Sequence, residues 1–170
     1  IGTSDFCIEF FASIPHLPNV SPTDYYLSSQ NGITGTSLLI IVNANGTISF
    51  FEGGGGTFLT TSSTVFSEMN KFYHVALSRN SGTYTAYIDG VVSGTSTTAG
   101  TKNFSQTTNY RIGQAYDSST AMNRKFEGLI SNYRLVIGYP VYTGNFSPPT
   151  EPFQASDQTG TEFIVLGNTP

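Results

Sequence analysis

The segment from Gln114 to Lys125 gathers side chains whose chemistry suits the recognition of a sugar. Neutral sugars are held by amides and carboxylates on their hydroxyl groups and by an aromatic ring against their C–H face. We predict carbohydrate-binding roles in this segment for Gln114, Tyr116, Asp117, Asn123 and Arg124. Tyr25 and Tyr26 would add stacking surface if their part of the chain lies nearby. A polar surface loop, or a contact with another subunit, is the alternative interpretation.

Other residues whose types could carry out chemistry have simpler explanations. The run Gly53–Gly56 invites comparison with a phosphate loop, but such loops need a helix N-terminus behind the glycines and usually a lysine. A strand pattern follows here, so we interpret the run as a hairpin connection. His74 lies within a strand pattern and is predicted to be a hydrogen-bonded structural residue, whereas His16 lies among prolines and is predicted to face solvent. No Gly-x-Ser-x-Gly nucleophile elbow and no zinc-spaced cluster of Cys and His occurs.

The stretch Lys71–Gly94 predicts the core of the architecture. Val75 and Leu77 fall on one face of a first run, while the alternate positions fall on the other. The second run has the same period of two, with one face formed by Tyr84, Ala86 and Ile88. Alternation in β-branched and aromatic residues is typical of strands, and Asp89-Gly90 supports the positive φ angles of a two-residue hairpin. We therefore predict a three-stranded antiparallel meander.

Shorter strand patterns fill the rest of the chain. They are expected at residues 5–11, 25–30, 37–42, 47–52, 57–61, 110–113, 126–136 and 162–166. The last is expected to pair beside the first, and Gly128 is the expected site of a β-bulge. The predicted core positions are Phe6, Ile8, Phe10, Val75, Leu77, Ile88, Ile112, Ile130 and Leu135. No repeat, domain boundary or long helix is visible, so residues 1–170 are predicted to form a single domain.

Composition excludes two classes of partner. The 170 residues carry a net charge of −4, and no segment concentrates Lys or Arg, so a nucleic-acid interface is not expected. The longest aliphatic run, Leu38–Val42, is far too short to cross a membrane. Charged residues make up 11% of the chain, below the usual share of about a quarter. A surface built from Ser, Thr, Asn and Gly suits neutral ligands or neighbouring subunits, and the lone Cys7 is predicted to be a small buried hydrophobic residue.

Several of these segments resemble a known family. The run Phe-Tyr-His-Val-Ala-Leu-Ser-Arg, then a glycine turn and Tyr-Ile-Asp-Gly, resembles the central hairpin of laminin G-like, concanavalin A-like jelly-roll domains. Other segments resemble further strands of these domains in the expected order: Asp5–Phe11, Asn45–Phe50, Arg111–Gly113 and Phe126–Arg134. Val141–Thr150 resembles an ending common in bacteriophage virion proteins and large bacterial surface proteins. The resemblance implies an all-β, two-sheet antiparallel jelly-roll sandwich. Tryptophans usual in the family near Phe11 and at Phe72 are absent.

Endoglucanases also use this fold, which makes a glycan hydrolase the enzyme alternative. They carry two carboxylates on one strand separated by a single residue, about 7 Å apart. The sequence has no pair of carboxylates at that spacing, and Asp5 and Glu9 would lie about 13 Å apart along one strand. We therefore predict that the chain is not an enzyme.

Calcium is the one metal that the resemblance implies. Related domains often hold it at one rim of the sandwich through Asp side chains and backbone carbonyls. Asp24 and Asp117 are loop carboxylates that could serve as ligands, with ordinary turn-forming aspartate as the alternative.

These observations together predict a non-enzymatic, surface-displayed module for adhesion or structural support, with glycans as expected ligands. The leading interpretation is a bacteriophage virion component, such as a tail fibre, an appendage or a capsid decoration. The alternative is an extracellular bacterial lectin or adhesin module, and a glycan hydrolase comes third. The expected partners are other virion or surface subunits, with the chain in a homo-oligomer or in repeated display. The expected location is the virion surface or the extracellular space.

Overall fold

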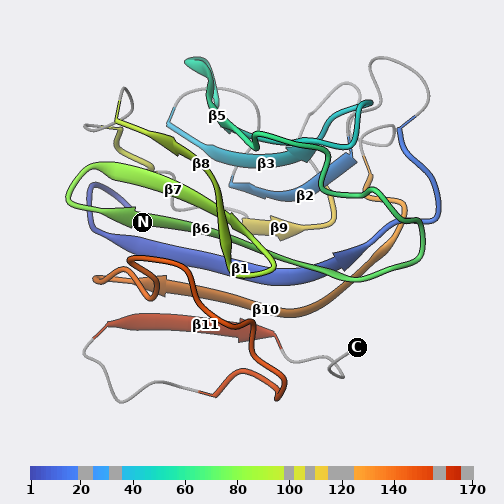
Figure 1. The fold of residues 1–170 in the computed structure, drawn as a ribbon. Helices are drawn as coiled ribbons and strands as arrows, with labels where there is room; N and C mark the ends of the chain where they lie inside the picture. The colour runs from blue at the N-terminus through green and yellow to red at the C-terminus, as the bar shows by residue number, and fades with distance from the viewer. Residues whose placement is uncertain are drawn as a thin grey trace.

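The computed structural model describes residues 1–18, 25–30, 36–97, 102–105, 110–114, 125–154 and 160–165. Over these residues, two antiparallel sheets pack face to face around one apolar core (Figure 1). This arrangement confirms the predicted all-β, two-sheet antiparallel jelly-roll sandwich. None of the described residues is helical, so this part of the chain contains no helix that could span a membrane.

The larger sheet has six strands in the order β11-β10-β1-β6-β7-β8. Its strands are β1 (Phe6–Ser13), β6 (Tyr73–Asn80), β7 (Thr83–Ile88), β8 (Val91–Ser96), β10 (Leu129–Ile137) and β11 (Thr161–Val165). The smaller sheet has five strands in the order β5-β4-β3-β2-β9. Its strands are β2 (Tyr25–Gln30), β3 (Leu38–Val42), β4 (Ile48–Glu52), β5 (Gly56–Thr60) and β9 (Tyr110–Ile112).

The predicted meander is present as β6, β7 and β8. Val75 pairs with Ile88 and Ser78 with Thr85, so the β6–β7 hairpin keeps the expected alternation of faces, whereas the β7–β8 register shifts between Ala86 and Tyr87. Asp89 has φ 48° and Gly90 has φ 77°, as a two-residue turn with positive φ at both positions requires. The turn between β6 and β7 was expected to be slightly longer. It is a two-residue turn as well, because Ser81 adopts φ 49° ahead of a glycine.

The core between the sheets contains the predicted residues. Six of them are buried: Phe6, Ile8, Phe10, Val75, Leu77 and Leu135. Ile88, Ile112 and Ile130 are partly buried and pack against that cluster. Rings fill much of the space, as in the stacked pair Phe10 and Tyr133, whose centroids lie 5.6 Å apart. Phenylalanine and tyrosine thus supply much of the volume of this core, in a sequence that has no tryptophan.

Two sequence-based expectations about strand order and bulging were wrong. β11 pairs with β10 rather than with β1, because β10 already occupies the edge of β1 that β6 leaves open. The β-bulge lies at Asn132 (φ 50°), where the β1–β10 register shifts, and not at Gly128. Gly128 instead allows its backbone to lie close to Ser13, since a Cβ there would lie 2.2 Å from the Ser13 carbonyl oxygen.

After β10 the chain crosses the outward face of the six-stranded sheet before it returns as β11 (Figure 1). We call residues 139–154 the cover segment. Prolines lack the N–H donors of a regular ladder, and this segment holds Pro140, Pro148, Pro149 and Pro152. The segment docks on the β7–β8 turn, where the Phe146 N–H donates to the Gly90 carbonyl oxygen at 2.9 Å. The Val92 N–H also donates to Asn145 Oδ1 at 3.0 Å.

Candidate binding site

Outward side chains of β1, β6 and β10 form an ionic cluster beneath the cover segment. Glu9 is fully buried, and its Oε2 accepts hydrogen bonds from His74 Nε2 at 3.0 Å and from the Tyr142 hydroxyl at 2.8 Å. Its Oε1 accepts a hydrogen bond from Arg134 Nε at 2.8 Å. This arrangement confirms the prediction that His74 is a hydrogen-bonded structural residue.

The charges in this cluster are mutually stabilised. Burial alone would raise the pKa of Glu9, but the hydrogen bond from His74 and the charge of Arg134 outweigh burial and lower that pKa. Burial and the Glu9 charge raise the pKa of Tyr142, so its hydroxyl keeps the proton that it donates. Neither Glu9 nor His74 has exposed surface, so a substrate cannot reach them. The cluster therefore anchors the cover segment.

Aromatic packing holds the same part of the cover segment. The rings of Tyr142 and Phe146 stack with centroids 3.4 Å apart, and Phe146 meets Tyr87 edge-on at 5.4 Å. Ser78 Oγ donates to the Tyr142 carbonyl oxygen at 2.9 Å. Ring stacking, hydrogen bonds and the ionic cluster therefore hold the cover segment on the sheet. One edge of the segment faces solvent.

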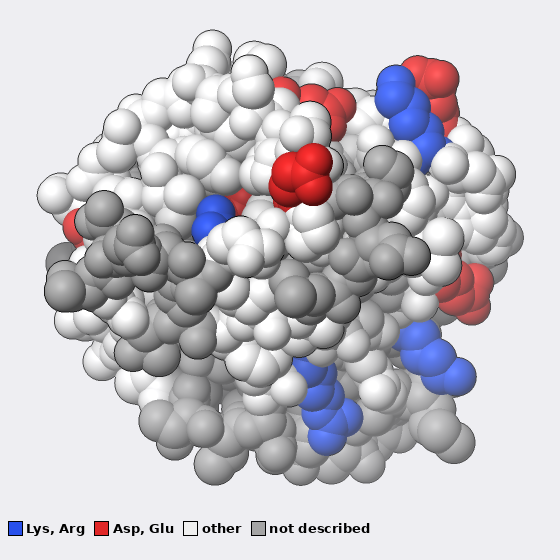
Figure 2. Space-filling view, turned by 90° about the horizontal axis from the view of Figure 1, so that it is seen from below, with Lys and Arg blue, Asp and Glu red and all other residues white. Residues whose placement is uncertain are grey.

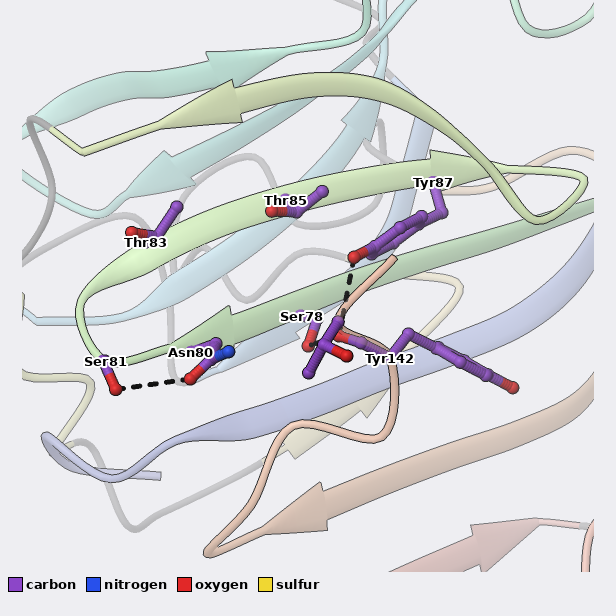
Figure 3. Close-up of a pocket in the computed structure, with 8 residues that line it drawn as sticks. Ser78, Asn80, Ser81, Thr83, Thr85, Tyr87 and Tyr142 are labelled. Atoms are coloured by element: carbon purple, nitrogen blue, oxygen red, sulfur yellow. Dashed lines mark hydrogen bonds between the residues drawn. The ribbon is translucent and has the colours of Figure 1, made fainter. Parts of the chain in front are cut away.

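A cleft opens between this edge and the outward faces of β6 and β7 (Figure 3). We call it the outer cleft. Its volume is about 400 Å³, and it is lined by Ser78, Asn80, Ser81, Thr83, Thr85, Tyr87, Tyr142 and Thr143. Strand register creates its floor, because Ser78 pairs with Thr85 and Asn80 with Thr83 across the β6–β7 hairpin. Every lining side chain is uncharged.

The outer cleft offers hydrogen-bonding groups on several sides. The Tyr87 hydroxyl donates to the Tyr142 carbonyl oxygen at 3.5 Å, and Tyr87 is 2% exposed, so its ring offers no open stacking face (Figure 3). Within the described part of the chain, the hydroxyls of Thr83 and Thr143 have no hydrogen-bond partner. Each hydroxyl can donate and accept, which suits a ligand that carries hydroxyl groups of its own.

Of the predicted sugar-binding residues that the structure describes, Gln114, Tyr25 and Tyr26 lie outside the outer cleft, after β9 and in β2. Gln114 follows β9, where its carbonyl oxygen accepts a hydrogen bond from Ser29 Oγ at 2.7 Å and its backbone bridges to Lys125. Four of the predicted residues lie outside the described part of the chain: Tyr116, Asp117, Asn123 and Arg124. Their role in binding sugar stays a prediction.

Tyr25 and Tyr26 both lie in β2 and are 4% exposed. Tyr25 donates a hydrogen bond to Glu127 Oε2 at 3.1 Å, and burial together with that carboxylate raises its pKa to about 12. Tyr26 packs with Leu39 and Ile41 on the outward face of the smaller sheet. Both rings therefore contact protein in this structure, and neither offers the free stacking face that the sequence analysis expected of them.

Two acidic side chains outside the ionic cluster are engaged by neighbouring groups. Glu52 forms an ion pair with Lys102, and Glu127 bonds to Tyr25 beside His16, which is solvent-exposed as predicted. No three His, Cys, Asp or Glu side chains are grouped for metal binding among the residues that the structure describes. The candidate calcium ligands Asp24 and Asp117 lie outside those residues, so calcium binding stays a prediction.

Comparison with known families accounts for the sandwich. Residues 1–137, most of the chain, match the sequence profile of the concanavalin A-like lectin/glucanases superfamily. The chain belongs to this superfamily. The concanavalin A-like match ends with the last residue of β10, so the cover segment that forms one wall of the outer cleft lies beyond it. No curated protein is similar enough in sequence to be matched.

Solved structures share the concanavalin A-like fold at low identity. A Bacteroides ovatus protein described as carbohydrate binding has 17% identity and a TM-score of 0.60, with 84% of this chain and 39% of that protein covered. A heptameric SAP-like pentraxin from Limulus polyphemus has 12% identity and a TM-score of 0.64, with 98% and 84% covered. The CBM40 domain of a Ruminococcus gnavus sialidase has 14% identity and a TM-score of 0.57, with 74% and 72% covered. At these identities the likeness shows the fold.

The sequence did not predict the outer cleft, although it placed the strand residues of the cleft on one face. Period-two alternation already places Ser78, Thr83 and Thr85 on the face opposite the core. The other wall comes from Tyr142 and Thr143, which are far away in sequence and reach the cleft only because the cover segment folds back.

Proposed function

We propose that this chain is a non-enzymatic, surface-displayed module that binds glycans through the outer cleft. The observation that carries the proposal is the lining of the cleft, which consists of hydroxyl, amide and phenol groups with no charged side chain. Such a lining can exchange hydrogen bonds with the hydroxyls of a sugar and contains no carboxylate or imidazole for acid–base catalysis. The nearby carboxylate of Glu9 is buried and neutralised by Arg134.

Proteins of the same fold support a carbohydrate ligand. The Bacteroides ovatus protein is described as carbohydrate binding, and the Ruminococcus gnavus CBM40 structure holds α2,3-sialyllactose. Because this chain spans 39% of the Bacteroides protein, the activity of that whole protein is not transferred. A binding module without catalysis agrees with the absence from the sequence of two carboxylates one residue apart.

The loop containing Gln114, Tyr116, Asp117, Asn123 and Arg124 is a second proposed contact for sugar. Asp24 and Asp117 are its proposed calcium ligands. A calcium requirement distinguishes the two sites, since no carboxylate is among the residues that line the outer cleft. Binding that survives a chelator would therefore belong to the outer cleft.

Thr85→Val is expected to weaken glycan binding about 2- to 10-fold, the value of one hydrogen bond. Valine keeps the volume and the β-branch of threonine, so the strand should be preserved. Ligands retained on a glycan array would be titrated into the ¹⁵N-labelled chain, with signals of Thr83 and Thr143 as the reporters. Thr57→Val, an exposed position on β5 in the other sheet, is the matched control and should bind as the parent does. Equal binding by both variants would remove the outer cleft as the site.

We further propose display in many copies on a virion or a cell surface, as a tail fibre, appendage or capsid decoration. A shallow site on a single chain is expected to bind in the millimolar range, about −4 kcal/mol. Linked copies raise avidity by about 10²–10⁴-fold. Charged side chains are few and scattered on the face in Figure 2, which suits side-by-side packing of neutral surfaces.

Display in many copies can be measured with chains biotinylated at the N-terminus. Tetrameric display on streptavidin should retain glycan-coated beads that the single chain does not retain. Submicromolar binding of a sugar by the single chain would contradict this account.

A further inference from the structure

We infer that the outer cleft selects neutral sugars and rejects those that carry a carboxylate. This inference rests on the proposed glycan-binding function and adds the class of ligand. It follows from the charges around the cleft, which the residues of β1, β6 and the cover segment determine.

A carboxylate borders the outer cleft, and no cationic side chain is among the described residues that line it. Asp5 Oδ1 accepts a hydrogen bond from the Ser81 N–H at 2.9 Å, which places its carboxylate at the turn that ends the cleft. None of the eight lining residues is Lys, Arg or His. An anionic sugar would therefore meet a like charge at one end and neutral groups elsewhere.

Two arginines of the larger sheet could supply a cation, but both are engaged by other groups. Arg79 lies between two lining residues of β6, but alternation directs its side chain inward, over the ring of Tyr84. Its Nη1 donates to the Lys102 carbonyl oxygen at 2.9 Å. Arg134 is held by Glu9 beneath the cover segment. Neither guanidinium is available to a ligand in the cleft.

The lack of a cation in the lining weakens the binding of an acidic sugar but not that of a neutral sugar. A sugar hydroxyl that leaves water can regain its hydrogen bonds from the Thr83, Thr85 and Thr143 hydroxyls. An ionised carboxylate loses stronger hydration, and hydroxyl groups without a counter-charge do not restore it. We therefore expect the neutral member of a matched pair of sugars to bind at least about 10-fold more tightly than the acidic member.

Matched pairs that differ only at C6 test the inference. Methyl β-glucoside with methyl β-glucuronide, and methyl β-galactoside with methyl β-galacturonide, would be titrated separately into the ¹⁵N-labelled full chain at neutral pH. We expect the neutral member of at least one pair to shift the signals of Thr83, Thr85 and Thr143 at millimolar concentration, with its acidic partner about 10-fold weaker. Equal or tighter binding of the acidic members would overturn the selectivity and leave the proposed function standing. If none of the four sugars shifts these signals, the inference fails. If the glycan array also retains nothing, the proposed function fails with it.

A charge placed in the cleft provides the second test. Thr143→Lys adds a cation at an exposed lining position. The affinity for methyl β-glucuronide should then come to within about 2-fold of the affinity for methyl β-glucoside. Added salt should weaken this effect. Thr150→Lys carries the same charge at an exposed position of the cover segment outside the lining, and should leave the ratio unchanged. If Thr143→Lys also leaves the ratio unchanged, charge does not set the selectivity and the inference is wrong.

Discussion

Gly90→Val is expected to destabilise the fold by about 3–5 kcal/mol, among the largest effects of a single substitution. Gly90 has φ 77°, and a Cβ added there would lie 1.9 Å from the Phe146 carbonyl oxygen. A β-branched residue resists this φ, and the clash would also push the cover segment off the turn. The free energy of unfolding in urea, measured for both proteins, gives the difference.

Two other glycines separate backbone strain from the clash. Gly56 has φ 84° with nothing within 4 Å of an added Cβ, so Gly56→Val carries the strain alone. Gly144 lies in the cover segment, and an added Cβ there would also meet nothing within 4 Å. The expected loss of stability is largest at Gly90, smaller at Gly56 and smallest at Gly144. Equal losses at Gly90 and Gly56 would show that the cover segment does not rest on the β7–β8 turn.

Glu9→Gln is expected to cost about 3 kcal/mol, because it leaves the guanidinium of Arg134 without its carboxylate beneath the cover segment. The cover segment should also loosen. Cys7 reports this, since it is buried on the same outward face of β1 and burial raises the pKa of its thiol. We expect the thiol to react faster with a disulfide reagent in the variant.

Glu68→Gln is the matched control, because Glu68 forms an exposed ion pair with Lys71. It should change neither the urea midpoint nor the reactivity of Cys7. A Glu9→Gln variant that matched this control would show that the ionic cluster does not anchor the cover segment.

The pH dependence of stability follows from the same cluster. The pKa of Glu9 is lower in the folded state than in the unfolded chain, so its contribution is complete above the unfolded value of about 4.3. The contribution is lost as the pH falls from there through the lowered, folded-state pKa. Urea midpoints measured at neutral pH and at about pH 3 should therefore differ less in Glu9→Gln than in the parent. An equal loss in both proteins would assign the acid sensitivity to other carboxylates.

The sequence by itself determined the strands and the turns of the meander, and the two-sheet sandwich was implied by the resemblance of several segments to laminin G-like domains. Alternation in residues such as Val75 and Leu77 assigns each side chain to a face, because side chains on a strand repeat every two residues. Asp89-Gly90 predicts its turn because only a few residue types accept positive φ. Both patterns are contained in a few neighbouring residues, so they can be recognised without knowledge of the rest of the fold.

Only the tertiary structure decided what covers the outward face of the larger sheet. Glu9 and Arg134 become partners through the register between β1 and β10, which a bulge at Asn132 adjusts. The proline-rich cover segment forms no strand, so no local pattern predicts where it docks. The outer cleft exists because this docking brings Thr143 beside the β6–β7 hairpin. Contacts between segments so far apart depend on the packing of the whole chain, and local periodicity carries no information about them.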